Sequence, residues 1–177
     1  MRHVAAARRE IGQRTIFNLL GPLSNPAGVK RQLMGVFAPD FMEPVAKALK
    51  SLGAERVIVV HGAGGVDELT GDDGDLWIDV DGAVTRLSAV GAENAESAKI
   101  ALRGGTAEEN AVALRALLDG SSENGVYRNV VELNATMALV AAGLPLDEAA
   151  TLPREAIEGG EALARLDALI EITRSAP

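Results

Sequence analysis

The sequence predicts an α/β protein: a mainly parallel central sheet flanked by helices, with a helical C-terminal part, in a single partial domain over residues 1–177. In RVIVV, from Arg56 to Val60, an uninterrupted β-branched run follows the arginine, which is typical of a strand buried on both faces. Strand, helix and strand follow one another within about 30 residues from Gln32 onward, which is the spacing of a parallel, right-handed βαβ unit. The second half of the chain carries mainly helical patterns.

The βαβ unit begins with a short apolar strand over Gln32 to Phe37. The following helix is expected from Pro39 to Leu52, since proline suits a first helical turn and Gly53 suits the position after a helix end. Apolar residues recur on one helix face. This face consists of Phe41, Val45, Ala48, Leu49 and Leu52.

A β-hairpin is expected next, with strands over Leu76 to Val80 and Ala83 to Leu87. Asp81-Gly82 provides the residues that a type I′ turn requires. Trp77 is expected to be packed in the interior rather than to act as a stacking platform. The stretch from Ser88 to Leu102 is polar and alanine-rich, and we expect a loop with partial helix.

Helices follow. Thr106 and Glu109 form a capping box that opens a helix running to Asp119 and ended by Gly120. A helix over Val126 to Ala142 has an almost continuous apolar face and contains Asn134, which either satisfies a neighbouring backbone group or approaches a ligand. A final amphipathic pair is expected over 146–158 and 160–174.

Composition limits the classes of function. The formal net charge of −8 argues against a nucleic-acid surface, and an anionic substrate would need local arginines, helix N-termini or a bound cation. The chain has no cysteine, which excludes disulfides and agrees with a cytoplasmic protein. No apolar run reaches the roughly 20 residues of a membrane span.

The N-terminal region carries the first candidate site residues. Residues 2–11 have a helical pattern in which Arg8 and Arg9 are either solvated near a helix C-terminus or positioned to bind a carboxylate. The segment Arg14 to Pro26, RTIFNLLGPLSNP, follows. Its prolines are expected to push Gly21 and Asn25 out of the α region, so that the chain turns sharply and presents backbone groups to a small ligand.

The second candidate region is the loop His61 to Thr70, HGAGGVDELT, which begins where a predicted strand ends. Ligands of open α/β sheets gather at the carboxyl ends of strands. Asp67 and Glu68 could bind a hard cation such as Mg²⁺ together with substrate phosphates, or Asp67 could cap a turn while Glu68 is solvated. His61 is expected to be structural, and the acidic turn 72–75 does not have the spacing of an EF-hand.

Three runs, RREIGQRTIFNLLGPLSNPAG, QLMGVF and VVHGAGGVDELT, resemble the second half of the anthranilate phosphoribosyltransferase family of tryptophan biosynthesis. The resemblance implies part of a nucleoside-phosphorylase/phosphoribosyltransferase catalytic domain. It implies transfer of a 5-phosphoribosyl group from phosphoribosyl pyrophosphate to anthranilate, with Mg²⁺ held by Asp67 and Glu68. It further implies that Arg8 contacts the carboxylate of anthranilate, and that Gly21 and Pro22 line the channel through which anthranilate enters.

The family begins with a helical domain, through which its members usually form homodimers, and a Gly-rich loop for the donor phosphates. Neither is found in this sequence, so Met1 is expected to be an internal methionine of a longer protein, and the chain alone is expected to be inactive. The alternative is a non-catalytic α/β module with at most weak binding of Mg²⁺ and pyrophosphate. Pyrimidine-nucleoside phosphorylases share the fold, but the motif from Arg14 to Pro26 argues against them. The Phe-Gly or Leu-Pro turn that the family usually carries near residues 88–102 is also missing.

Overall fold

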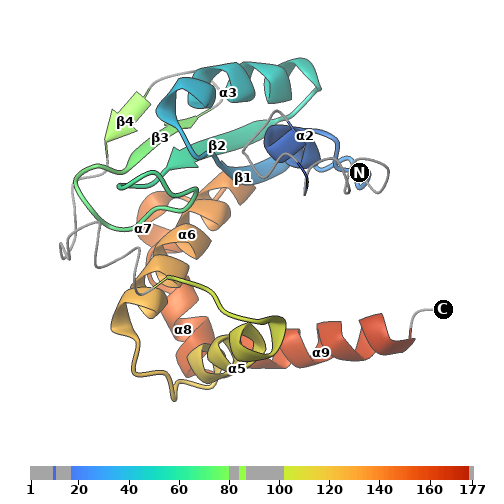
Figure 1. Ribbon diagram of the computed structural model, residues 1–177, viewed down its shortest axis with the longest axis vertical. Coiled ribbons are helices and arrows are strands. Elements are labelled where there is room, and N and C mark those ends of the chain that lie inside the picture. The colour runs from blue at the N-terminus through green and yellow to red at the C-terminus, as the bar shows by residue number, and fades with distance from the viewer. Residues whose placement is uncertain (1–9, 11–16, 80–83, 87–101, 176–177) are drawn as a thin grey trace.

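The computed structural model describes residues 10, 17–79, 84–86 and 102–175, and its α/β class agrees with the prediction (Figure 1). A small sheet is covered by helices on both faces, and a group of helices follows it. The elements in chain order are α2 (Phe17–Leu23), β1 (Arg31–Gly35), the 3-10 helix η2 (Pro39–Phe41), α3 (Met42–Ser51), β2 (Arg56–His61), β3 (Leu76–Asp79), β4 (Val84–Arg86), α5 (Ala107–Leu118), α6 (Gly125–Ala142), α7 (Leu146–Ala149), α8 (Leu152–Glu158) and α9 (Glu161–Ser175).

The described strands form one mixed sheet in the order β1-β2-β3-β4. β1 and β2 are parallel, with Leu33 opposite Ile58, and α3 connects them, which confirms the βαβ unit. β3 runs antiparallel to β2, and β4 runs antiparallel to β3, as the predicted hairpin requires. The expectation of a mainly parallel sheet is therefore wrong for the described strands, because the hairpin adds two antiparallel neighbours to a single parallel pair.

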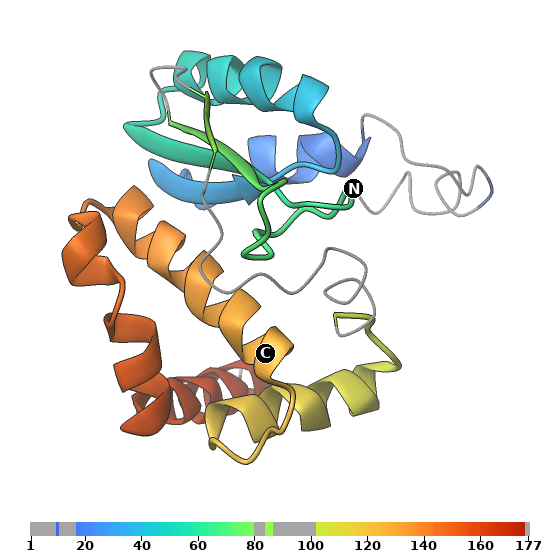
Figure 2. The same ribbon diagram turned by 90° about the vertical axis from the view of Figure 1, so that its left-hand side faces the viewer.

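The core has two layers because β2 is buried on both faces. Val57 and Val59 pack with α3 on one face of the sheet, and Ile58 and Val60 pack with α6 on the other. Figure 2 shows α3 and α6 on the two sides of the strands. This alternation confirms the prediction from the RVIVV run, since successive side chains of a strand point to opposite faces.

The helix between the two parallel strands agrees with the sequence except at its end. Pro39 opens it as a 3-10 turn, and Gly53 has the positive φ of a residue that follows a helix end. Val45 and Leu49 are buried as expected, whereas Leu52 is 62% exposed. Leu52 lies just beyond the last helical residue, Ser51, so it no longer follows the periodicity of the buried face.

The expected sharp turn at Gly21 is not observed, because α2 continues through Gly21 and Pro22 to Leu23. Pro22 is the sixth of seven helical residues, so it interrupts hydrogen bonding only near the helix end. Leu19 from the same helix is buried in the α3-side core, and this packing favours a continued helix. The preference of a residue before proline for extended backbone is thus outweighed here.

The helical part confirms most of the predicted elements. Thr106 caps α5 in a capping box with Glu109, and Gly120 follows the end of the helix with positive φ. The single helix expected over 146–158 is divided into α7 and α8, because Pro153 begins a new helix near its N-terminus. In the part of the chain that the structure describes, no helix is both long and apolar enough to cross a membrane.

Several expectations concern residues outside the described ranges. These are the helix over 2–11 apart from Glu10, the turn at Asp81-Gly82 and the loop over 88–101.

Candidate functional site

The acidic loop, residues 62–75, connects β2 to β3 at the carboxyl edge of the parallel strands. It begins with a tight turn, in which the Gly62 N–H donates to the Val66 carbonyl at 3.0 Å and the Gly65 N–H donates to the Gly62 carbonyl at 3.2 Å. Gly64 and Gly65 have positive φ, which side-chain-bearing residues rarely adopt. The glycines therefore reverse the chain directly before Asp67 and Glu68.

Two other glycines allow the backbone of this loop to lie against the strand ends. A Cβ atom placed on Gly35, the last residue of β1, would be 1.6 Å from the carbonyl oxygen of Asp67. A Cβ atom on Gly62 would be 1.8 Å from the carbonyl oxygen of Glu68. Both positions must be glycine for the Asp67–Glu68 backbone to sit where it does, because real Cβ atoms do not approach oxygens this closely.

A fully buried carboxylate, that of Asp75, ties the two ends of the loop together. One oxygen accepts hydrogen bonds from the Ala63 N–H at 2.8 Å and the Thr70 hydroxyl at 2.9 Å. The other accepts from the N–H groups of Thr70 and Gly71, both at 2.7 Å. In the sequence, Asp75 stands out only as part of the acidic turn 72–75. Its position directly before the predicted strand at Leu76 was the one available signal of a structural role.

Asn134 of helix α6 hydrogen-bonds to the backbone of Leu69, the residue that follows the Asp67–Glu68 pair. The Asn134 side-chain amide accepts from the Leu69 N–H at 3.0 Å and donates to the Leu69 carbonyl at 2.8 Å. Its second N–H donates to the Val130 carbonyl at 2.8 Å. Of the two interpretations considered for Asn134, the structure shows the one in which it satisfies backbone groups. The Leu69 side chain is completely buried next to α6, which holds the loop in place further.

Asp67 and Glu68 are exposed residues, although their backbone is held against the strand ends. Partial burial of the Glu68 carboxyl group raises its pKa, and the negative charge of neighbouring Asp67 raises it further. Two adjacent carboxylates that repel each other are a suitable donor set for a hard cation, which would neutralise both. Within residues 10, 17–79, 84–86 and 102–175, no group of three or more potential metal ligands is found, so water or substrate oxygens would complete the coordination.

A small cavity adjoins Glu68 and has a volume of about 340 Å³. It lies between the acidic loop and the helical part of the chain, and its lining is mostly apolar. The lining residues are Val66, Glu68, Leu102, Tyr127, Val130, Val131 and Asn134. One wall of the carboxylate site is therefore formed by α6.

His61 has the structural role that was expected for it. The side chain is 8% exposed, and its Nδ1 lies 2.8 Å from the carbonyl oxygen of Val36. This contact connects the end of β2 to the residue after β1, directly beside the two close-approach glycines.

The structure does not bring all the predicted site residues together. Arg8 lies outside the described residues. Pro22 lines a cavity together with Lys30 and Ala54, which directly precede β1 and β2, so Pro22 lies at the amino edge of the sheet. Asp67 lies against Gly35, the last residue of β1, at the carboxyl edge. The loop and α2 lie toward opposite ends of the sheet in Figure 1. Pro22 and the acidic pair therefore lie at opposite edges of the sheet.

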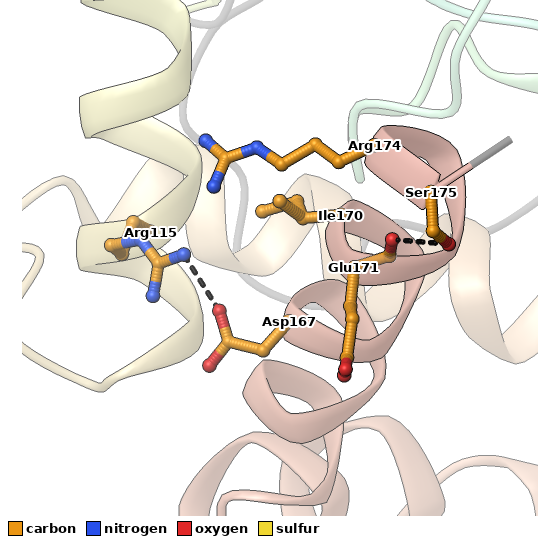
Figure 3. A pocket seen from close by; sticks show the side chains of 6 residues that line it. All are labelled: Arg115, Asp167, Ile170, Glu171, Arg174 and Ser175. Atoms are coloured by element: carbon orange, nitrogen blue, oxygen red, sulfur yellow. Dashed lines mark hydrogen bonds and ion pairs between the residues drawn. The ribbon is translucent and has the colours of Figure 1, made fainter. Parts of the chain in front are cut away.

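A further cavity lies between α5 and α9, away from the sheet (Figure 3). Arg115 and Asp167 form an ion pair of 2.7 Å across it, and both side chains are about half exposed. Arg174 and Glu171 extend along its rim. Exposed ion pairs of this kind contribute little to the stability of the fold. None of the residues that line the cavity is a buried polar group that could select a ligand.

Comparison with known proteins identifies the family to which the chain belongs. Residues 1–163 match the family described as "Glycosyl transferase family, a/b domain", and the chain belongs to that family. Among its relatives, the anthranilate phosphoribosyltransferase of Paramagnetospirillum magneticum is 49% identical, over 98% of this chain and 51% of the relative. The enzyme of the same name from Methylocella silvestris is 45% identical, over 99% of this chain and 51% of the relative.

Solved structures of anthranilate phosphoribosyltransferases share the fold of the chain. The anthranilate phosphoribosyltransferase of Thermus thermophilus superposes with a TM-score of 0.81 at 39% identity, covering 99% of this chain and 53% of that one. The Saccharomyces cerevisiae enzyme in complex with PRPP and Mg superposes with a TM-score of 0.78 at 23% identity, covering 99% and 50%, which supports the fold alone. The chain spans about half the length of the curated relatives it matches.

Proposed function

We propose that the chain takes part in transferring a 5-phosphoribosyl group from phosphoribosyl pyrophosphate to anthranilate. The proposal is supported by relatives of 45–49% identity that carry the name of this activity. The observation that carries it is the pair Asp67 and Glu68, whose backbone is held against Gly35 and Gly62 at the carboxyl edge of the parallel strands. Lack of cysteine agrees with a cytoplasmic location for this activity.

Asp67 and Glu68 are proposed to hold Mg²⁺ against the donor. When bound, Mg²⁺ neutralises the negative charge that grows on the departing pyrophosphate. The contribution of the chain is to present two carboxylate oxygens from a backbone that cannot shift toward the strands. The raised pKa of Glu68 reflects burial and the charge of Asp67, and a cation between the two groups would relieve that repulsion.

The acceptor side rests on Arg8, Gly21 and Pro22. A planar guanidinium matches a carboxylate in a two-point hydrogen bond, so Arg8 is proposed to bind the carboxylate of anthranilate. Gly21 and Pro22 are proposed to line the channel of the acceptor. Pro22 lies at the opposite edge from the acidic pair, so the acceptor role is tested separately from the metal role. The aromatic amine is already nucleophilic, and no strong general base is assigned.

Calorimetry with Mg²⁺ and pyrophosphate tests the metal proposal. The wild-type chain is expected to bind the pair, and the double variant Asp67→Asn/Glu68→Gln is expected to lose that binding. The matched control is Asp72→Asn/Asp73→Asn, which removes the same charge from the same loop. Equal affinity of the wild type and the Asp67→Asn/Glu68→Gln variant would disprove the proposal.

Steady-state kinetics tests the acceptor role in the protein as its organism makes it. Arg8→Ala is expected to raise the KM for anthranilate and to change the KM for phosphoribosyl pyrophosphate much less. Arg9→Ala provides the control, since it removes an equal charge from the adjacent residue. A change confined to the donor KM would contradict the assignment.

A further inference from the structure

We propose that Asp75 and Asn134 are positioning residues that determine how tightly the Asp67–Glu68 pair binds a divalent cation. Neither side chain belongs to the pair, and they reach the acidic loop from different elements. Asp75 precedes β3, and Asn134 lies in the middle of α6. The inference rests on the proposed metal-binding role and assigns a function to residues that the carboxylate motif does not include.

Asp75 fixes the separation between the two arms of the loop. Its carboxylate bonds to Ala63 on the arm before the pair and to Thr70 and Gly71 on the arm after it, all within 2.9 Å. All four donors are N–H or O–H groups, so both carboxylate oxygens must act as acceptors. In either orientation an asparagine would turn its NH₂ group toward at least one backbone N–H, either that of Ala63 or those of Thr70 and Gly71, which would break at least one bond and create repulsion. The requirement is therefore for a carboxylate and not only for a residue of that size.

Asn134 fixes the loop from the other side. Its amide pairs with both the N–H and the carbonyl of Leu69, the residue after Glu68, as a neighbouring strand would. The third bond, to the Val130 carbonyl, sets the orientation of the amide and uses both of its N–H groups. An aspartate at this position would place an oxygen against the carbonyls of Leu69 and Val130, and would lose both donated bonds.

Together these contacts address an electrostatic problem in the pair. Two neighbouring carboxylates repel each other, and a flexible loop would let them separate when no cation is present. In this structure the backbone on both sides of the pair is held by buried or partly buried hydrogen bonds, and Gly35 and Gly62 set its depth. The ligand oxygens are thus arranged before a cation arrives. Residues that orient metal ligands in this way typically change metal affinity by about 10–100-fold when they are mutated.

The test measures Mn²⁺ affinity by electron paramagnetic resonance, well below the melting temperature of each variant. Asp75→Asn is expected to weaken binding by about 10–100-fold. Asp72→Asn removes the same charge from the same turn, where its carboxylate makes one long contact of 3.4 Å to the Gly74 N–H, and should bind nearly as the wild type does. Asn134→Asp is the sharper variant. The added negative charge would by itself raise the affinity for Mn²⁺, whereas loss of positioning predicts a decrease.

The outcomes separate this inference from the metal assignment. Weaker binding by Asp75→Asn and Asn134→Asp, with Asp72→Asn unaffected, supports it. If the wild type binds Mn²⁺ and Asp67→Asn/Glu68→Gln does not, while Asn134→Asp binds as well as the wild type or better, the positioning role is overturned and the metal assignment stands. If the wild type does not bind Mn²⁺, both are overturned. Should Asp75→Asn not fold, Thr70→Val, which removes one of the four bonds to Asp75, replaces it with an expected loss of several-fold. A residue that only stabilises the fold would lower the melting temperature without changing the affinity of the folded protein.

Discussion

Substitution of Gly35 by alanine tests how the acidic loop is held. Gly35 does not have positive φ, so alanine is compatible with its backbone conformation, and only the space around it forbids a side chain. The added Cβ would lie 1.6 Å from the Asp67 carbonyl oxygen, and contacts below 3.0 Å are essentially never seen. The loop or the strand must therefore move by at least about 1.4 Å.

This displacement has two expected consequences. Overpacking of this kind costs about 1–3 kcal/mol, which corresponds to a decrease of about 2–12 °C in Tm for a chain of this size. Since Asp67 is the residue displaced, Mn²⁺ affinity should fall by at least about 10-fold. Thermal unfolding can be followed through Trp77, the only tryptophan, which lies in β3 beside β2.

The matched control is Gly125→Ala at the start of α6, where a Cβ would meet nothing within 4 Å. It should unfold at or slightly above the wild-type temperature, because alanine restricts the unfolded chain. A Gly35→Ala variant with the Tm and Mn²⁺ affinity of the wild type would refute the view that close packing against β1 positions the pair.

The remaining predictions concern stability. Burial alone would raise the pKa of Glu132, but hydrogen bonds from Arg128 and Arg154 outweigh burial and lower it. The folded state therefore binds the proton less tightly than the unfolded chain, so the stabilisation is complete above about pH 4.3, where an unfolded glutamate ionises, and is lost as pH falls through the lower, folded pKa. The Tm difference between wild type and Glu132→Gln should be largest near pH 7 and shrink below pH 4; a constant difference would contradict this. Thr106→Ala removes the side-chain cap of α5 and should cost about 1 kcal/mol in urea unfolding, while Thr173→Ala near the end of α9 should cost much less. Ile58→Ala opens a cavity on the α6 side of β2, where Ile58 is 1% exposed, and should cost about 2–5 kcal/mol; a loss below 1 kcal/mol would show that the two-layer core is wrong.

The parts of the fold that the sequence predicts correctly are those in which local signals and packing agree. The apolar run of β2 requires two covered faces, and both α3 and α6 supply them. The capping box of Thr106 and Glu109 depends on four consecutive residues, and the structure contains it as the sequence predicts. Where the two conflict, packing prevails: α2 continues through Gly21 and Pro22 because Leu19 is anchored in the core.

Of the candidate site, the sequence predicts the two exposed carboxylates but not the residues that hold their backbone. Asp67 and Glu68 stand out because adjacent carboxylates follow a glycine-rich segment at a strand end. The sequence singles out Asn134 as a residue that could satisfy a backbone group, but its partner Leu69 could not be identified because it lies 65 residues away. The hydrogen bonds by which Asp75 joins both arms of the loop could not be read from an acidic turn. The role of Gly35 could not be predicted either, because the sequence of a strand does not show that the backbone of a distant loop will pack directly against it.

Anomalous diffraction from crystals grown with Mn²⁺ and pyrophosphate tests the central claim most directly. The expected result is a single strong peak about 2.0–2.2 Å from carboxylate oxygens of both Asp67 and Glu68, with the loop backbone in place against Gly35 and Gly62. A peak bound by other residues, or a loop that moves away from these glycines to reach the ion, would contradict a carboxylate pair that is arranged in advance for a divalent cation.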